Sequence, residues 1–325
     1  MMSMFGSLLS ISSMSWFTSW MGLEMNLLTI IPLMKTKNIW YSSESTIKYF
    51  IIQSISSMIL IFSISSIMNL KIIDNPILPC LLISSCFLMK MGAAPFHFWL
   101  PEISNGFKWP ILFFILTWQK LAPSMLLMYF NYYFTLMIIT IILSSIIGSV
   151  QGLNQVCLRK LLAYSSINHM SWMISSLVSS YKLWMIYFII YSLSNLFIIF
   201  ILNKFNIYFL NKMMNIFPQN KFMKLLFMMN FLSLGGLPPF IGFLPKWLLI
   251  NSMIFNGLYW LTFFIIIFNI ISLFYYLRIT FSSLMFNSSN LQTYTSESYF
   301  LLYSFLNHLF ILSLPLWLII SNFYI

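Results

Sequence analysis

Five ionisable side chains interrupt long apolar stretches of the sequence. They are Glu24, Lys90, Lys120, His169 and Lys246. A full charge at the centre of a membrane helix costs about 2.5–3.5 kcal/mol, so pairing or internal water must offset most of that cost. Burial disfavours the charged form of such a group, whereas a nearby opposite charge favours it. A lysine held between these tendencies can exchange its proton when a neighbouring charge moves, which is the chemistry that a proton relay needs.

The surroundings of these residues favour the relay to different degrees. Glu24 lies in WMGLEMNLL and Lys120 in ILTWQKLAPSMLL, and both stretches are apolar on either side of the charge. Lys246 is preceded by LPPFIGFLP and followed by WLLI, which favours a deep position over an interfacial one. His169, in YSSINHMSWM, is equally well explained as a hydrogen-bonded packing residue. His97 is flanked by aromatic residues near a segment end, so we expect it in the aromatic belt at the membrane surface.

Composition indicates which elements must position these residues. The chain has 325 residues, of which 60% are hydrophobic and 6% are charged. Soluble domains carry about 25% charged residues. Apolar runs of about 20 residues recur along the chain, and each can cross a hydrocarbon core about 30 Å thick. The runs are continuous, unlike the alternating strands of a membrane β-barrel, so the sequence predicts an all-α polytopic membrane protein.

We expect one transmembrane domain over residues 1–325 with about eleven helices. The expected segments are 4–20, 21–34, 47–69, 76–100, 110–129, 133–150, 161–178, 183–203, 222–249, 254–279 and 299–321. Residues 4–130 and 133–280 would form two five-helix repeats, followed by a C-terminal helix at 299–321. Because five is odd, the second repeat would be inverted relative to the first.

The fourth segment of each repeat contains helix-breaking residues beside a lysine. KMGAAPFHFWLPE begins at Lys90, and GGLPPFIGFLPK ends at Lys246. Paired Gly- and Pro-broken segments are typical of inverted-repeat transporters with a site near the middle of the membrane. Broken backbone at that depth needs protein or water around it, so we expect two interrupted helices and a hydrated interior.

The net charge of +11 is explained by membrane topology. When loops are assigned alternately to two sides, one side receives little beyond Lys71 and Lys182. The other side receives Lys35, Lys37, Lys48, Lys108, Arg159, Lys160, Lys204, Lys212, Lys221, Lys224 and Arg278. The positive-inside rule then places the N-terminus on the basic, cytoplasm-like side and the C-terminus on the opposite side. No basic cluster suited to nucleic acid is present.

Several kinds of chemistry have no signal in the sequence. It lacks GxGxxG, GxxxxGKS/T and CxxC motifs, which bind dinucleotides, nucleotide phosphates and clusters. The three cysteines, Cys80, Cys86 and Cys157, have no metal-binding spacing. We therefore expect the chain to bind no cofactor or metal of its own.

Several blocks of the sequence resemble a known family. They are KMGAAPFHFWLPE (90–102), LTWQKLAPSMLL (116–127), GLNQVCLRKLLAYSSINHMSWM (152–173) and MNFLSLGGLPPFIGFLPKW (229–247). These blocks resemble chain 2 of NADH–ubiquinone oxidoreductase in its insect form, a family of antiporter-like subunits in the membrane arm of respiratory complex I. WMGLEMNLLTIIPLM (20–34) and ESTIKYFIIQ (44–53) fit the same family. The short lead before Trp16 departs from it.

The resemblance implies a proton-translocating subunit of the mitochondrial inner membrane. It assigns Glu24 and Lys90 as a pair, Lys120 as the connecting lysine and Lys246 as the lysine of the second half, and His169 falls in a matching block. NADH, FMN, iron–sulfur clusters and ubiquinone would bind elsewhere in the complex. The partners would be other membrane-arm subunits, including neighbouring antiporter-like ones, and membrane lipids such as cardiolipin. The basic side would be the matrix, so the C-terminus would face the intermembrane space.

Two other functions remain open at this level. The first is a stand-alone secondary cation/proton antiporter, which would exchange ions when reconstituted alone. The second is a structural subunit whose internal charges only hold helices together. In that case charge-removing substitutions would damage assembly and never affect pumping alone.

Overall fold

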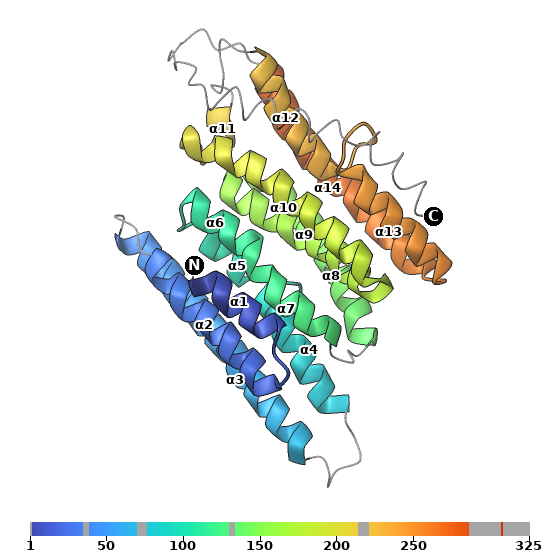
Figure 1. Ribbon diagram of the computed structural model, residues 1–325. Coiled ribbons are helices and arrows are strands. Elements are labelled where there is room, and N and C mark those ends of the chain that lie inside the picture. Colours follow the sequence, from blue (N-terminus) through green and yellow to red (C-terminus); the bar gives the residue numbers. More distant parts are fainter. Residues whose placement is uncertain are drawn as a thin grey trace.

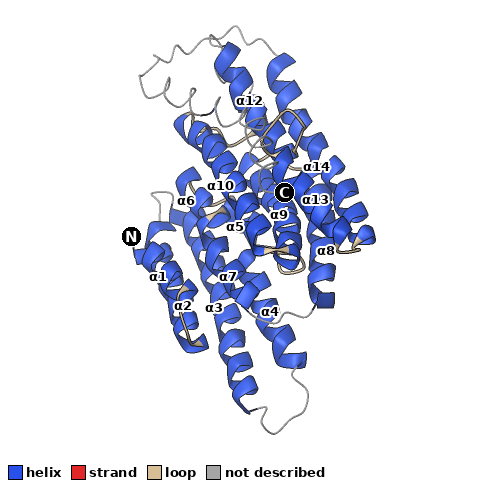
Figure 2. Ribbon diagram, turned by 45° about the vertical axis from the view of Figure 1, so that its right-hand side comes forward, coloured by secondary structure: helices blue, strands red, loops and turns tan. Residues whose placement is uncertain are grey.

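The structure of the chain is a computed structural model that describes residues 2–34, 39–69, 77–129, 134–213 and 221–285, and Asn307. Within these ranges every element is a helix, apart from a β-bridge between Cys157 and Phe209 (Figure 2). Five of the described helical stretches are long and apolar enough to cross a membrane. The predicted class, a multi-pass all-α membrane protein, is confirmed. Except for Asn307, the expected helix at 299–321 lies outside the described residues.

The helices lie side by side, with those of the first and second halves of the chain on opposite sides of the bundle (Figure 1). The first half contains α1 (Met2–Ile11), α2 (Trp16–Met34), α3 (Ile39–Asn69), α4 (Ile77–Met91), α5 (Trp99–Ser104), α6 (Trp109–Leu116) and α7 (Trp118–Tyr129). The second half contains α8 (Phe134–Leu153), α9 (Leu158–Ser179), α10 (Tyr181–Lys204), α11 (Leu210–Met213), α12 (Lys221–Gly235), α13 (Phe243–Phe255) and α14 (Tyr259–Met285).

The first two helices are divided differently from the prediction. The expected boundary at residues 20 and 21 is wrong, because the chain turns at residues 12–15, between α1 and α2. The hydroxyl of Ser15 accepts a hydrogen bond from the backbone N–H of Thr18 at 3.3 Å, which caps the start of α2. With ten residues, α1 is about 15 Å long and shorter than the hydrocarbon core.

Both predicted helix interruptions are present. The first separates α4 from α5, and the second separates α12 from α13. Each begins at a glycine in the left-handed region, Gly92 with φ +72° and Gly236 with φ +82°, a conformation that side chains with a Cβ rarely adopt.

A third irregularity, between α6 and α7, was not predicted. The hydroxyl of Thr117 donates to the Phe113 carbonyl at 2.8 Å, a type of contact that bends helices. Pro123 lies inside α7 and has no N–H to continue the helical ladder. The helical span from Trp109 to Tyr129 is therefore interrupted at Thr117, close to Lys120.

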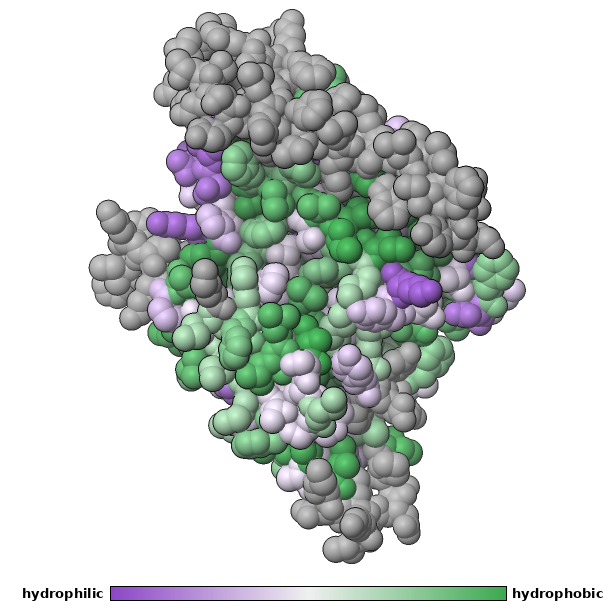
Figure 3. Space-filling model, viewed as in Figure 1, coloured by the Kyte–Doolittle hydropathy of each residue, from purple (hydrophilic) through white to green (hydrophobic). Residues whose placement is uncertain are grey.

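The central helix of the bundle is α9, which packs against α5, α6, α8, α10, α13 and α14. Its residues are buried on almost every side, although many of them are serines. A helix enclosed by other helices needs no apolar, lipid-facing surface, which explains why α9 is absent from the five apolar stretches. On the face in Figure 3, the most hydrophilic side chains lie mainly toward the edges.

Candidate functional site

Lys90 occupies the last turn of α4, directly before the first interruption, and is only 6% exposed. It lines a small cavity together with Asn26 of α2, Tyr49 and Gln53 of α3, and Gln119 of α7. The centre of a water molecule could occupy a volume of about 20 Å³ in this cavity. A volume of about 10–15 Å³, measured in the same way, is enough to hold one water molecule. The surroundings of Lys90 are thus polar and large enough to be hydrated.

Glu24 of α2 is half-buried and is close enough to Lys90 and Tyr49 to interact with both electrostatically. It does not touch Lys90: in the described ranges the ion pairs within 4.0 Å join Lys48 to Glu44 and Glu102. One carboxylate oxygen of Glu24 is buried without a hydrogen-bond partner. The pair implied by the resemblance is therefore separated in this structure.

Lys120 lies in the first turn of α7, directly after the Thr117 irregularity, and is 2% exposed. Its ammonium donates to the Ser166 carbonyl of α9 at 3.4 Å and lies 5.3 Å from the centre of the Tyr191 ring of α10. The preceding residue, Gln119, lines the Lys90 cavity instead. Adjacent residues of α7 thus contact the first and the second half of the protein.

His169 of α9 is 4% exposed. Its Nδ1 shares a 2.7 Å hydrogen bond with the hydroxyl of Tyr187, while its Nε2 is buried without a partner. The ring interacts electrostatically with both Lys120 and Lys246. His169 is therefore within electrostatic range of both lysines, and its hydrogen bond to Tyr187 also fits the packing interpretation.

Lys246 lies in the first turn of α13, after the second interruption, and is 4% exposed. Its ammonium donates to the carbonyls of Leu234 at 3.1 Å and Gly235 at 2.9 Å, and to Asn269 Oδ1 at 2.7 Å. The two carbonyls belong to the last residues of α12, where the helix dipole favours a positive charge. The side chain thus reaches back across the interruption to the end of the preceding helix.

The lysine stem passes very close to Gly236. A Cβ on this residue would lie 2.8 Å from Lys246 Cδ and 3.0 Å from its Nζ. The sequence therefore needs glycine here both for the left-handed backbone and for the path of the lysine.

His97 does not lie in an interfacial belt, so that prediction is wrong. It is 1% exposed, and its Nδ1 lies 3.3 Å from the Pro95 carbonyl within the first interruption. The interruption directs the His97 side chain toward the protein interior. The aromatic residues next to it in the sequence gave no sign of this orientation.

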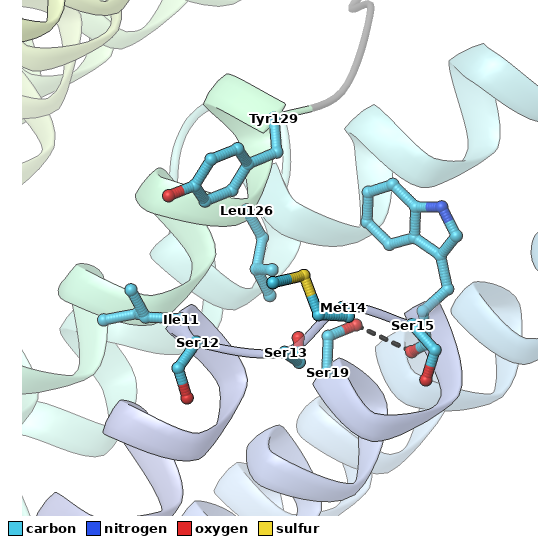
Figure 4. A pocket seen from close by; sticks show the side chains of 9 residues that line it. Ile11, Ser12, Ser13, Met14, Ser15, Ser19, Leu126 and Tyr129 are labelled. Atoms are coloured by element: carbon cyan, nitrogen blue, oxygen red, sulfur yellow. Dashed lines mark hydrogen bonds between the residues drawn. The ribbon is translucent and has the colours of Figure 1, made fainter.

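A much larger pocket is shown in Figure 4. It measures about 470 Å³ and is formed by the α1–α2 connection and the end of α7, including Ser12, Ser15, Leu126 and Tyr129. None of the five predicted site residues lines it. In the described part of the chain, no group of three or more His, Cys, Asp or Glu side chains could hold a metal ion.

Comparison with known proteins identifies the family. The family model described as the transmembrane part of NADH:quinone oxidoreductase and Mrp antiporter subunits matches residues 13–272. NADH-ubiquinone oxidoreductase chain 2 of Anopheles gambiae is 44% identical over 88% of this chain and 85% of its own length. The chain belongs to the family of NADH-ubiquinone oxidoreductase chain 2. The Locusta migratoria member is 42% identical over 87% of this chain and 83% of its own length.

Solved structures share the fold. A chain of respiratory complex I from Thermus thermophilus matches with a TM-score of 0.85 and 22% identity, over 96% of this chain and 76% of that one. A chain of the Mrp complex from Dietzia sp. DQ12-45-1b matches with a TM-score of 0.77 and 14% identity, over 86% and 58%. At these identities the likeness shows the fold alone.

The uncharged residues of the site were missed by reasoning that searched for charges. They are Tyr49, Gln119, Tyr187 and Asn269. An internal repeat signals two of them, because KYFIIQSISS (48–57) and IYFIIYSLSN (186–195) are identical at six of ten positions. This alignment pairs Tyr49 with Tyr187, and each lines a small cavity that also contains a buried lysine.

Proposed function

We propose that the chain translocates protons as a membrane-arm subunit of respiratory NADH:ubiquinone oxidoreductase, complex I, in the mitochondrial inner membrane. The relatives named chain 2 of that enzyme support this assignment. The observation that carries it is a series of buried ionisable groups running through the bundle. From α4 to α13 these are Lys90, Lys120, His169 and Lys246.

The proposed mechanism follows from the contacts of these groups. Lys120 and Lys246 both interact with His169, so a charge on either one disfavours a charge on the histidine. Loss of a proton from one site therefore favours uptake by the next, and the sites titrate as a coupled set. A shift in the position of Glu24 relative to Lys90 would start or receive this movement in the first half.

We include in the proposal two inverted repeats, at 4–130 and 133–280, within eleven helices. GAAPFHFWLPE (92–102) and GLPPFIGFLPK (236–246) share Gly, Pro, Phe and Leu-Pro at the same spacing. In the expected order of segments, α1 corresponds to α8, α2 to α9 and α7 to α14. The contacts support this order, because α1 packs on α2 and α7 as α8 packs on α9 and α14.

A stripe of small residues also recurs in the two proposed repeats. Ser3, Gly6, Ser7 and Ser10 of α1 have the spacing of Ser145, Gly148, Ser149 and Gly152 of α8, and all of them are buried. Small residues let helix backbones approach closely.

The remaining parts of the proposal rest on the sequence and the family. The N-terminus would face the matrix and the C-terminus the intermembrane space. The chain would hold no redox centre, and NADH, FMN, iron–sulfur clusters and ubiquinone would bind other subunits. Its partners would be neighbouring membrane-arm subunits and lipids such as cardiolipin.

The family model, whose description also names Mrp antiporters, favours one second candidate, a stand-alone cation/proton antiporter. If the chain is a subunit of complex I, it should comigrate with NADH-oxidising activity on a native gel. The chain reconstituted alone should then show no ion exchange. Ion exchange by the isolated chain would support the antiporter instead.

The proposed function is tested by Lys90→Met in the assembled complex. Methionine is an unbranched side chain one atom shorter than lysine and has no titratable nitrogen, so NADH-driven proton translocation should fall while the complex still assembles. Lys182→Met is the matched control, because Lys182 is exposed and should leave translocation unchanged. An unaltered ratio of protons translocated to NADH oxidised in Lys90→Met would refute the proposal.

A further inference from the structure

The hydroxyl of Tyr49 is fixed in place beside Lys90. Tyr49 lies in the middle of α3 and is 2% exposed, with its ring packed at 6.2 Å from that of Trp99. The side-chain amide of Gln119 donates a hydrogen bond to the Tyr49 oxygen. A phenol oxygen carries one hydrogen of its own, so this bond leaves the Tyr49 hydrogen available for another acceptor.

The cavity that Tyr49 and Lys90 share has the complementary groups for one water molecule. Asn26 and Gln119 both line it, and each has a buried side-chain oxygen without a hydrogen-bond partner. Buried polar atoms are rarely left unpaired, and a buried water usually makes about three hydrogen bonds. A water here would accept from the Lys90 ammonium and the Tyr49 hydroxyl and donate to the unpartnered Gln119 oxygen.

The second half contains an equivalent arrangement. Tyr187, the counterpart of Tyr49 in the repeated segment, shares its hydrogen bond with His169 and lines a cavity of about 10 Å³ with His169 and Lys246. Glu24 and His169 both lie on the second helix of their proposed repeat. In each half, a tyrosine hydroxyl therefore lies near the titratable residue of that helix and the lysine of the interrupted helix.

We propose that the Tyr49 cavity binds a single water molecule and that Tyr49, held by Gln119, positions this water against Lys90. The water then gives Lys90 a hydrogen-bonded connection to Tyr49, which interacts electrostatically with Glu24. This inference rests on the proposed function, since it concerns how protons reach the same lysine.

The test uses the assembled complex with Tyr49→Phe, and Tyr259→Phe as the matched control. Both variants lose one hydroxyl and keep the ring, but Tyr259 is 63% exposed at the start of α14. Two quantities are measured: the density in the cavity in a map that resolves ordered water, and the rate of NADH-driven proton translocation per assembled complex. A purely structural role for Tyr49 would change the amount of complex and leave both of these unchanged.

We expect water density between Tyr49 and Lys90 in the parent complex and in Tyr259→Phe, and its loss in Tyr49→Phe. Translocation should fall about tenfold in Tyr49→Phe, equivalent to about 1.4 kcal/mol in the barrier. Gln119→Leu should reproduce both effects, because it releases the Tyr49 oxygen and removes one acceptor.

A dry cavity in the parent complex, or translocation by Tyr49→Phe equal to that of Tyr259→Phe, would overturn the inference. Lys90→Met separates this failure from failure of the proposed function. If Lys90→Met stops translocation and Tyr49→Phe does not, only the role of the tyrosine is wrong. If neither variant affects translocation, the proposed function is wrong as well.

Discussion

Replacing Gly236 with alanine should displace the ammonium of Lys246 with little disturbance elsewhere. The new Cβ would lie 2.8 Å from Lys246 Cδ and 3.0 Å from Nζ. These distances are shorter than the usual van der Waals contacts of a Cβ atom. The neighbouring atoms are the far end of a flexible side chain, so the lysine and not the backbone should move. That movement takes Nζ away from the carbonyls of Leu234 and Gly235, which it contacts at 3.1 and 2.9 Å.

Two costs combine in this variant. Alanine in the left-handed region costs about 1–2 kcal/mol, because Gly236 has φ +82°. Each hydrogen bond to a charged group contributes about 1.5–3 kcal/mol. Loss of at least one of these two bonds, together with the backbone strain, should destabilise the protein by about 2.5–5 kcal/mol or more.

Gly257→Ala is the control that isolates the backbone term. Gly257 has φ +74°, and a Cβ there would meet no atom within 4 Å. It should therefore cost only the strain, about 1–2 kcal/mol. Thermal inactivation of the assembled complex and its proton translocation are measured for both variants. Equal thermal midpoints and equal translocation would refute the conclusion that Gly236 is needed for the position of Lys246.

Two further substitutions test single contacts of the site and its frame. Asn269→Leu removes the oxygen 2.7 Å from Lys246 Nζ and should cost about 1.5–3 kcal/mol and slow translocation; an unchanged thermal midpoint and rate would contradict this. Gly148→Ala would place a Cβ 2.5 Å from the backbone nitrogen of Asn168, so α8 and α9 must separate and the amount of assembled complex on a native gel should fall. Gly235→Ala, with its nearest contact at 3.5 Å, should assemble normally, and equal assembly of the two alanine variants would contradict the close packing.

The burial of the charged residues and the two interruptions could be predicted because each produces a strong local signal. A lysine inside a long apolar run, as at Lys90 or Lys120, has few places to lie except the interior of a bundle, and both are buried. Glycine and proline beside a lysine likewise predicted the breaks at Gly92 and Gly236. The roles of these residues in proton transfer stay predictions.

Other features depend on contacts between segments and have weaker signals. Lys246 follows its interruption in the sequence, yet its ammonium lies at the end of the preceding helix. This position depends on the path of the lysine side chain past Gly236, which has no signal in the sequence. The irregularity at Thr117 involves a hydrogen bond from its side chain to the backbone within one turn. The resemblance pairs Glu24 with Lys90, but in the described residues no ion pair within 4.0 Å joins them, and this distance depends on how α2 and α4 pack. A neutral residue such as Tyr49 does not stand out in an apolar sequence as a charged residue does. Its only signal is the internal repeat that pairs it with Tyr187.

The number of protons translocated per NADH oxidised by the assembled complex carrying Lys120→Met tests the central claim most directly. Lys120 is the buried lysine whose ammonium joins α7 to α9, so methionine, which is unbranched and only one atom shorter, should break the connection between the two halves while filling most of the same space. A lower proton-to-NADH ratio than in Lys182→Met, at equal amounts of assembled complex, is the predicted result. The same ratio in both variants would contradict the claim that buried lysines carry protons through this protein.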